Sequence, residues 1–259
     1  MRVLFVKQDH ASPSGLVGDA FAALRWDVSE LIVVPQSRYH SPDVPAVFPS
    51  AGAFDAIVFY GAPWSVYDTA TIGAWIGDEI AFARSAISLG VPVLGICFGG
   101  QMLAAAVGGS VSLAPTPEIG WISVSSSASS SAPDLIEAGP WFSWHFDRFT
   151  LPSGVDLLAR TPLANQAFSV GRSLGLQFHP EVNSEVLESW LATGGEEQLA
   201  EVGVAVPPLL AQTRLLTGAA TTRAATLVRR FVTDVARRPV VPVPVLPAAG
   251  DATVLTPTP

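Results

Sequence analysis

The only cysteine of the chain, Cys97, lies between two glycines in the order Gly95-Ile-Cys97-Phe-Gly99. An apolar segment of strand length, residues 91–96, precedes it, and strong helix formers follow from Gln101 onward. A nucleophile between two glycines at a strand-to-helix turn is the pattern of a nucleophile elbow, which is better known with serine. The glycines suit a sharp turn whose backbone passes close to its neighbours. The helix that follows favours a thiolate, so the pattern predicts a cysteine nucleophile.

Three other interpretations of this segment are open. A lone cysteine is commonly inert packing. The segment between Arg84 and Glu118 carries no charge, as a membrane span would, but Pro92 and six glycines interrupt the roughly 20 apolar residues that a span needs. A phosphate-binding loop would require Gly-x-Gly-x-x-Gly spacing, which is absent here. The nucleophile interpretation leads if the chain also supplies a base.

Of the four histidines, His179 is the candidate base, and it directly follows the mainly apolar residues 174–178. Pro180 follows it and holds the chain extended, so that Glu181 can fold back toward the imidazole. A thiol nucleophile requires a base within hydrogen-bond reach, and a carboxylate orients that base. The two segments together predict a catalytic triad of Cys97, His179 and Glu181. The competing interpretation is an ordinary His-Pro strand end with a surface glutamate.

Composition places the chain among soluble globular proteins. It has 259 residues, of which 49% are hydrophobic and 14% charged, and its formal net charge is −8. A chain of this length and apolar content can bury a sizeable core. The acidic balance and the lack of a basic cluster argue against nucleic-acid binding. The apolar start, residues 2–7, is too short for a signal peptide, so we expect a cytoplasmic protein without membrane association.

The first half of the chain alternates strand and helix patterns, which predicts a parallel sheet with right-handed crossovers. Ligands bind such sheets at the carboxyl ends of the strands, where Cys97 lies. The expected fold is therefore a three-layer α/β sandwich with a mixed, mainly parallel sheet and flanking helices. The predicted strands are residues 2–7, 27–34, 56–60 and 91–96, and the predicted helices are residues 16–24, 71–89 and 101–107.

The second half has short segments separated by turns, which predict antiparallel strands at residues 110–113, 121–125, 155–159, 164–170 and 174–178. Helical segments follow from residue 185 to residue 236, with Pro207 and Pro208 as a break. We expect one domain over residues 1–237. Residues 238–259 contain six prolines and no helical period, so we expect a flexible proline-rich tail.

The chain resembles the class I, triad-type glutamine amidotransferases, whose fold is flavodoxin-like. Two signature segments carry the resemblance, Gly95-Ile-Cys97-Phe-Gly-Gly-Gln101 and Gln177-Phe-His179-Pro-Glu181-Val. Three further matches are Gly61-Ala-Pro63-Trp-Ser65-Val-Tyr67-Asp68, Glu118-Ile-Gly-Trp121 and Trp144-His-Phe-Asp147. The matches run in the family's order and leave the proline-rich tail uncovered.

The resemblance implies a mechanism in which Cys97 attacks the side-chain carboxamide of glutamine and forms a thioester. His179 would then move protons to and from the reacting atoms, with Glu181 holding its tautomer. Backbone amides of Phe98 and the Gly61-Ala62 turn would stabilise the oxyanion. The substrate's amino-acid end would be bound by Gln101 and by the segment of Trp144, His145, Phe146 and Asp147.

Two residues depart from the family pattern. Ala62 stands where family members usually have glycine, which is tolerable if its φ is negative. Phe146 stands where related sequences often have glycine, and its ring would narrow the pocket or change the substrate preference. His145 and Asp147 would form a supporting pair behind the substrate.

The expected activity is glutamine hydrolysis that supplies ammonia to a separate synthase, because the resemblance covers no fused synthase domain. We expect no cofactor and no metal. An alternative activity is that of a stand-alone γ-glutamyl hydrolase acting on γ-glutamyl amides or peptides. A non-catalytic protein that keeps the fold is a third possibility, which an intact triad argues against.

Overall fold

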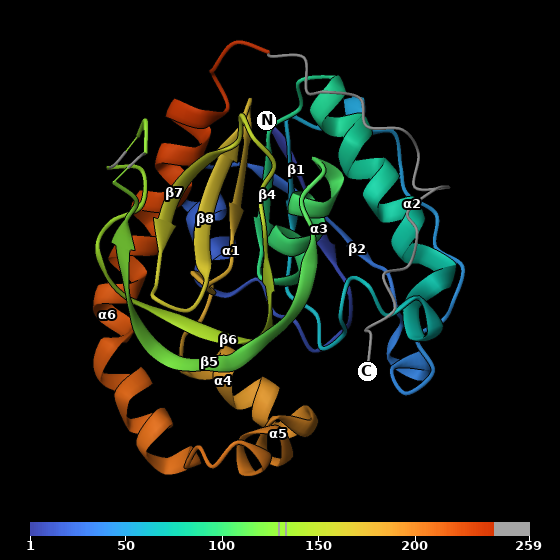
Figure 1. Ribbon diagram of the computed structural model, residues 1–259. Helices are drawn as coiled ribbons and strands as arrows, with labels where there is room; N and C mark the ends of the chain where they lie inside the picture. The colour runs from blue at the N-terminus through green and yellow to red at the C-terminus, as the bar shows by residue number, and fades with distance from the viewer. Residues whose placement is uncertain (129, 133, 241–259) are drawn as a thin grey trace.

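The computed structural model describes residues 1–128, 130–132 and 134–240, which form a central sheet between two layers of helices (Figure 1). The strands are β1 (Arg2–Lys7), β2 (Asp27–Ile32), β3 (Ala56–Phe59), β4 (Val93–Ile96), β5 (Val111–Ser126), β6 (Gly139–Phe149), β7 (Asp156–Arg160), β8 (Asn165–Val170) and β9 (Ser173–Leu176). The α-helices are α1 (Gly15–Ala23), α2 (Thr69–Ser88), α3 (Phe98–Ala106), α4 (Ser184–Trp190), α5 (Glu196–Glu201) and α6 (Val206–Arg230). Short 3₁₀ turns η1 (Gln36–Arg38) and η2 (Ala51–Ala53), and π-helical turns η3 (Leu191–Gly195) and η4 (Phe231–Val235), complete the described elements.

The sheet has nine strands within the described residues, in the order β2-β1-β3-β4-β9-β8-β7-β5-β6. The pairs from β2 to β9 are parallel, and those from β9 to β6 are antiparallel. The predicted α/β sandwich with a mixed sheet is therefore confirmed, and its antiparallel half contributes as many strand pairs as its parallel half. The parallel half presents the carboxyl ends of β1, β3, β4 and β9 along one edge.

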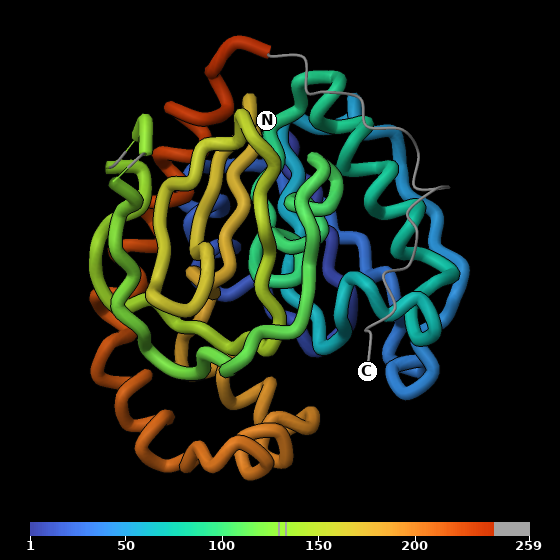
Figure 2. The backbone as a smooth tube through the Cα atoms, in the orientation of Figure 1, coloured from blue at the N-terminus to red at the C-terminus, as the bar shows by residue number. Residues whose placement is uncertain are grey.

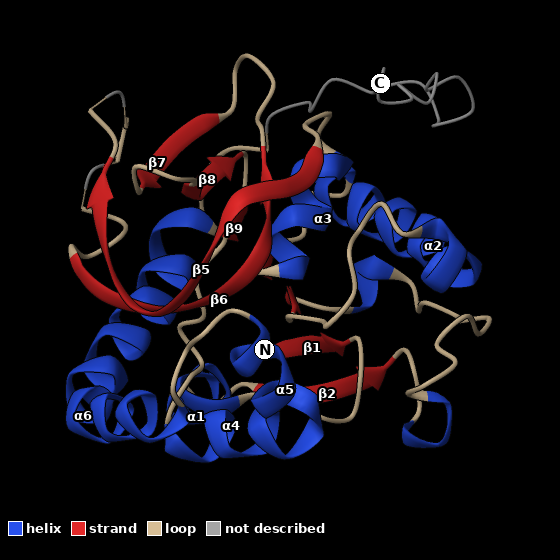
Figure 3. Ribbon diagram, turned by 60° about the horizontal axis from the view of Figure 1, so that its bottom comes forward, coloured by secondary structure: helices blue, strands red, loops and turns tan. Residues whose placement is uncertain are grey.

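The hairpin of β5 and β6 differs from the expectation. The sequence predicts two short strands at residues 110–113 and 121–125, and it predicts no strand at residues 139–149. In the structure β5 is one long strand with a register shift between Leu113 and Glu118, and β6 pairs with it antiparallel. The aromatic residues of β6 have high β-propensity, which was the available signal. Both strands curve strongly around the end of the molecule (Figure 3).

The core lies on both faces of the sheet, because successive side chains of a strand point to opposite sides. Val3 and Phe5 of β1 pack in the cluster that includes residues of α1 and α6. Leu4 and Val6 of the same strand pack in the cluster that includes residues of α2 and α3. Parallel strands that are covered on both faces have continuous apolar sequences, which explains the apolar residues 3–6 of β1. The three layers follow from this division.

The chain leaves the sheet after β9 and forms α4, η3 and α5 beside one end of the molecule before α6 returns along the sheet (Figure 2). Pro207 and Pro208 were expected to break a helix, and they lie in the first turn of α6. Proline is tolerated there because the first amides of a helix have no intrahelical partner. A separate apolar cluster, which includes Phe142, Val186 and Leu209, joins this segment to β6.

Two expectations concern the environment and the end of the chain. In the residues that the structure describes, no helix combines the length and the apolar character needed to cross a membrane. Most of the expected tail, residues 241–259, lies outside the described residues. The domain division at residue 237 stays a prediction.

A buried carboxyl group on α2 generates a first testable prediction. Glu79 is fully buried and accepts a hydrogen bond from Gln8 Nε2 at 2.6 Å. Burial raises the pKa of Glu79 from 4.5 to about 8, against the lowering effect of the Gln8 bond. Between these values the folded protein holds a proton that the unfolded chain releases, so rising pH destabilises the fold.

Glu79→Gln keeps the hydrogen-bond acceptor and removes the titration. We expect the variant to gain stability over the wild type as pH rises from about 5 to 8, by up to about 1.4 kcal/mol per pH unit. Denaturant unfolding at several pH values measures this difference. Asp78→Asn, which changes the exposed neighbouring carboxyl, is the control. A constant difference between Glu79→Gln and wild type across this range would contradict the prediction.

Candidate functional site

The segment around Cys97 has the backbone of an elbow. Cys97 lies between β4 and α3 with φ 50° and ψ −106°, in the positive-φ region that non-glycine residues rarely adopt. A Cβ on Gly99 would collide with the carbonyl of Phe59, and one on Gly100 with the carbonyl of Leu176. Glycines therefore let α3 approach β3 and β9 closely enough to hold Cys97 in this conformation. The side chain projects at the carboxyl end of the parallel strands.

His179 and Glu181 form a buried hydrogen-bonded pair. His179 Nδ1 lies 2.7 Å from Glu181 Oε1, and both residues are buried. The backbone N–H of His179 donates to the carbonyl of Phe142 at 2.7 Å, which ties the segment after β9 to β6. The rings of His179 and Trp190 pack in a T-shaped arrangement with their centroids 4.8 Å apart. These contacts fix the imidazole. Its other ring nitrogen, Nε2, makes no hydrogen bond to the described part of the chain.

The charge balance around His179 favours the imidazolium form. Burial alone would lower the pKa of His179, but the negative charge of Glu181, followed by that of Cys97, raises it to about 10. Since Nε2 has no partner in hydrogen-bonding geometry within the described chain, Cys97 acts on the ring mainly through its charge. Catalytic hydrogen bonds are often long before substrate binds. The arrangement suits a thiolate beside an imidazolium.

Gly61 brings a third segment to the same place. A Cβ on Gly61 would lie 3.0 Å from His179 Cε1 and 3.8 Å from Cys97 Cβ. The sulfur of Cys97 lies 3.8 Å from the carbonyl oxygen of Trp144 and 3.8 Å from Gln177 Nε2. The sequence-predicted nucleophile, base and oxyanion turn therefore meet in space, although they come from three separate stretches of chain.

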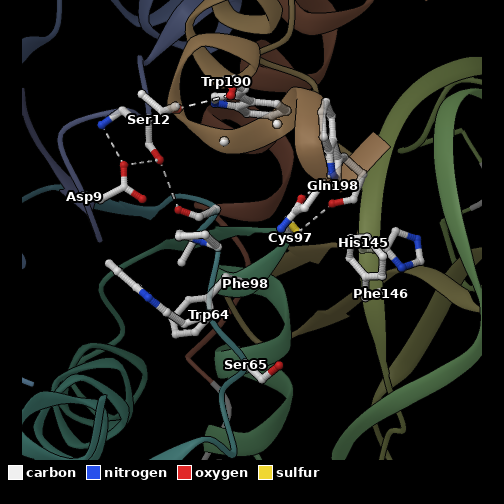
Figure 4. Close-up of a pocket in the computed structure, with 18 of the residues that line it drawn as sticks. Asp9, Ser12, Trp64, Ser65, Cys97, Phe98, His145, Phe146, Trp190 and Gln198 are labelled. Atoms are coloured by element: carbon white, nitrogen blue, oxygen red, sulfur yellow. Dashed lines mark hydrogen bonds between the residues drawn. The ribbon is translucent and has the colours of Figure 1, made fainter. Parts of the chain in front are cut away.

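A cavity of about 400 Å³ opens over these residues. Figure 4 shows Cys97 within it, with Asp9 and Ser12 on one side and His145 and Phe146 on the other. Glu181 stands behind His179 and does not line the cavity. The residues predicted from sequence that do line it are Gly61, Ala62, Cys97, Phe98, Gln101, Trp144, His145, Phe146, Asp147 and His179.

Polar contacts hold the side of the cavity that β6 forms. The carboxylate of Asp147 accepts hydrogen bonds from Ser65 Oγ at 2.6 Å and from Tyr67 OH at 2.9 Å. His145 Nδ1 lies 2.9 Å from the backbone oxygen of Asp147, and its Nε2 lies 3.2 Å from Glu118 Oε2. His145 and Asp147 are thus in contact as expected, but through a main-chain oxygen and not through the carboxylate.

Gln101 lies deeper in the same wall. Its Nε2 donates to the backbone oxygen of Asp147 at 3.4 Å and to Gln177 Oε1 at 3.3 Å. The side chain is buried, so its amide connects α3, β6 and the segment after β9. Its predicted contact with the amino-acid end of a substrate stays a prediction.

Several cavity residues were not found from the sequence: Asp9, Ser12, Tyr39, His40, Trp64, Trp190, Thr193 and Gln198. Asp9 and Ser12 follow β1, whose carboxyl end lies at the same sheet edge as that of β4, so topology was a usable signal for them. Trp190 and Thr193 come from α4 and η3, which fold over the cavity. No local pattern marks these two residues.

Comparisons with known proteins agree with the geometry. A family model described as "Glutamine amidotransferase class-I" matches residues 29–193, which is more than half of the chain. The chain belongs to the class I glutamine amidotransferase family. The resemblance inferred from the motifs is therefore confirmed.

Two relatives within this family differ in length. The chain is 36% identical over 157 residues to the glutamine-hydrolyzing GMP synthase of Thiobacillus denitrificans, covering 55% of the chain and 28% of that protein. It is 32% identical over 166 residues to a glutamine-hydrolyzing GMP synthase subunit from Sulfolobus acidocaldarius, covering 58% of the chain and 82% of that relative. The chain thus matches less than a third of the first relative and most of the second.

Solved structures are similar over nearly the whole chain. A glutamine amidotransferase from Thermotoga maritima superposes with a TM-score of 0.77 at 24% identity, covering 90% of this chain and 98% of that one. A glutamine amidotransferase from Methylobacillus flagellatus gives 0.76 at 24% identity, covering 92% and 96%. At this identity the similarity concerns the fold alone.

The two departures of this class I glutamine amidotransferase from the family pattern have different consequences. The non-glycine residues with positive φ in the described chain are Arg25 and Cys97, so Ala62 meets the condition under which alanine is tolerable. Phe146 is half-buried and lines the cavity. Its ring therefore affects the space available to a ligand.

The pair of His179 and Glu181 generates a second prediction. Glu181→Gln removes the negative charge that raises the pKa of His179, so this pKa should fall from about 10 by at least one unit. NMR titration of the protein with isotope-labelled histidine measures it. Glu185→Gln, which changes an exposed carboxylate in the same segment, should leave the His179 titration unchanged. An unaltered titration in Glu181→Gln would contradict the assigned cause.

Proposed function

We propose that the chain hydrolyses the side-chain amide of glutamine through a thioester on Cys97, with His179 and Glu181 completing the triad. The observation that supports this most is the meeting of the strained Cys97, the buried His179–Glu181 pair and the Gly61 turn at one cavity. Membership of the class I glutamine amidotransferase family gives the same reaction class. An inert buried cysteine would not require a positive φ or a buried carboxylate-imidazole pair beside it.

The reaction begins with attack of the Cys97 thiolate on the carboxamide carbon. His179, as the imidazolium, donates its Nε2 proton to the departing nitrogen, and ammonia leaves as the thioester forms. His179 then accepts a proton from water, which attacks the thioester carbonyl. Glutamate leaves, and the thiolate–imidazolium pair is restored. Glu181 keeps the proton of Nδ1 in place throughout, so Nε2 faces the reacting atoms.

We propose that two backbone amides stabilise the tetrahedral oxyanion. Phe98 is the first residue of α3. The first intrahelical bond runs from the N–H of Gln101 to the carbonyl of Cys97, so the N–H of Phe98 has no acceptor within the helix. The second donor is the N–H of Ala62 in the turn after β3. Donors directed at developing charge contribute about 3 kcal/mol each to lowering the barrier.

We further propose that the released ammonia is used by a separate synthase. The chain covers most of the length of a relative named as a subunit of a glutamine-hydrolyzing GMP synthase, which supports a two-chain arrangement. Free ammonia is protonated at neutral pH, so a glutaminase that feeds a synthesis benefits from a partner at the cavity mouth.

A second candidate function is hydrolysis of larger γ-glutamyl amides. The cavity volume of about 400 Å³ lies within the range of pockets that bury drug-sized ligands. This volume is larger than a free amino acid requires. Its walls include the aromatic side chains of Tyr39, Trp64, Phe146 and Trp190. Such walls suit an apolar substituent on the γ-amide nitrogen.

Substitutions in the triad give a third prediction. Cys97→Ala and His179→Ala should each lower the glutaminase kcat by about 10⁴-fold or more, because the nucleophile or its base is lost. Glu181→Ala should cost about 10- to 100-fold less than His179→Ala, since it removes only the orienting group. Glutamate release measures these rates, with Glu185→Ala as the matched control. Full activity in Cys97→Ala would remove the proposed mechanism.

Substrate comparison gives a fourth prediction. The purified protein should release glutamate from glutamine with a higher kcat/KM than from γ-glutamyl-benzylamide. Phe146→Gly should raise kcat/KM for the benzylamide by more than for glutamine, because it removes a ring from the cavity wall. Cleavage of the benzylamide without cleavage of glutamine would replace the first candidate function with the second.

A further inference from the structure

The loop between β1 and α1 contacts the turn that follows β3. Ser12 Oγ lies 3.4 Å from the backbone oxygen of Gly61. Figure 4 shows this contact at one side of the cavity, with Asp9 adjoining Ser12. Ser12 is not part of the triad or of any motif discussed above, and its side chain is directed at the backbone of the proposed oxyanion turn.

The geometry of the peptide group makes this contact informative. The backbone oxygen of Gly61 and the N–H of Ala62 belong to one planar peptide unit. In a trans peptide these two groups point in opposite directions, and the described residues contain no cis peptide bond. A hydrogen bond that holds the oxygen toward Ser12 therefore holds the N–H of Ala62 away from Ser12.

Gly61 also lies next to the two reacting side chains. A Cβ on Gly61 would lie 3.0 Å from His179 Cε1 and 3.8 Å from Cys97 Cβ. The Gly61 turn is thus close both to Ser12 and to the two reacting side chains. Rotation of the peptide would exchange the positions of the oxygen and the N–H, and the bond to Ser12 opposes that rotation.

Asp9 holds Ser12 in place. Asp9 Oδ1 accepts a hydrogen bond from the backbone N–H of Ala11 at 2.7 Å and lies 3.1 Å from Ser12 Oγ. Asp9 is only 2% exposed, so this short turn is anchored in the protein interior. The single hydroxyl proton of Ser12 has two acceptors, Asp9 Oδ1 and the Gly61 oxygen, an arrangement known from three-centre hydrogen bonds.

We infer that Ser12, oriented by Asp9, is a positioning residue that sets the Gly61–Ala62 peptide with the N–H of Ala62 directed at the oxyanion. This inference rests on the proposed function, since it concerns a carbonyl substrate attacked by Cys97. Ser12 acts through the peptide that supplies one oxyanion donor.

A specific kinetic signature follows from this role. An oxyanion exists in the transition state and not in the bound substrate, so loss of its donor lowers kcat and leaves KM nearly unchanged. Removal of a whole oxyanion donor costs about 10²- to 10³-fold in kcat. Loss of Ser12 leaves the donor present but free to rotate, so we expect a smaller reduction.

Ser12→Ala should lower kcat about 10- to 50-fold, with KM within about twofold of the wild type. Ser12→Thr retains the hydroxyl and should recover most of the rate. Ser14→Ala is the matched control, because Ser14 lies in the same loop and its side chain makes no capping hydrogen bond. The rates are measured by glutamate release from glutamine and from γ-glutamyl-p-nitroanilide.

A second measurement separates an effect on the oxyanion from an effect on the thiol. Iodoacetamide alkylates a thiolate by displacement at a saturated carbon and forms no oxyanion. The alkylation rate of Cys97 in Ser12→Ala should therefore equal that of the wild type while kcat falls. A parallel fall in alkylation would mean that Ser12 acts on the thiol, and this would overturn the inference.

Three other outcomes are decisive. A kcat of Ser12→Ala within twofold of the wild type would overturn the inference and leave the proposed function intact. A threonine variant as slow as the alanine variant would assign the effect to loop packing and also overturn it. A wild type that cleaves only the anilide would remove the glutaminase function, and the Ser12 comparison would then be decided on the anilide. Failure to cleave either substrate would overturn both.

Discussion

The close approach of α3 to the parallel sheet is the constraint on which the site depends. Gly99 and Gly100 have no side chains to collide with the carbonyls of Phe59 and Leu176, so the start of the helix can rest directly on β3 and β9. Cys97, at the junction, is thereby held in a backbone conformation that costs on the order of 1–3 kcal/mol. Such strain persists only where the surroundings over-determine it, and here β4 on one side and α3 on the other do so. The sulfur is presented at the strand ends directly between β4 and α3.

The strand order then determines which other groups can reach that sulfur. β1, β3, β4 and β9 are neighbours and parallel, so the residues that follow them gather at one edge. This places the Asp9–Ser12 loop, the Gly61 turn and His179 around Cys97, as described above. The antiparallel hairpin of β5 and β6 curves toward the same edge and supplies the wall that contains Trp144 and Asp147. Residues from both the parallel and the antiparallel half of the sheet thus line one cavity.

Burial strengthens the ionic and hydrogen-bond contacts of the charged groups at this edge of the sheet. The carboxylate of Glu181 is removed from water and has His179 as its close partner, which is why the imidazolium form is favoured against the cost of burying it. The carboxylate of Asp147 is likewise satisfied by two hydroxyl groups from the loop after β3. Removal of one partner of such a pair leaves an uncompensated buried charge, so these contacts also hold the loop and β6 together.

The sequence by itself determined the α/β class, the parallel half of the sheet and the candidate nucleophile, base and carboxylate. These follow from local features: apolar runs of strand length, helix formers after Gly99, and glycines or proline at fixed offsets from Cys97 and His179. The sequence did not reveal β6 as a strand, the union of residues 111–126 into one strand, or the cavity residues from α4 and η3. Only the tertiary structure decided these points, because the curvature of a hairpin and the fold of a helix over a cavity depend on packing between distant segments. The contact of Ser12 with Gly61 joins residues 49 positions apart, and no local pattern specifies which backbone oxygen a loop serine will meet.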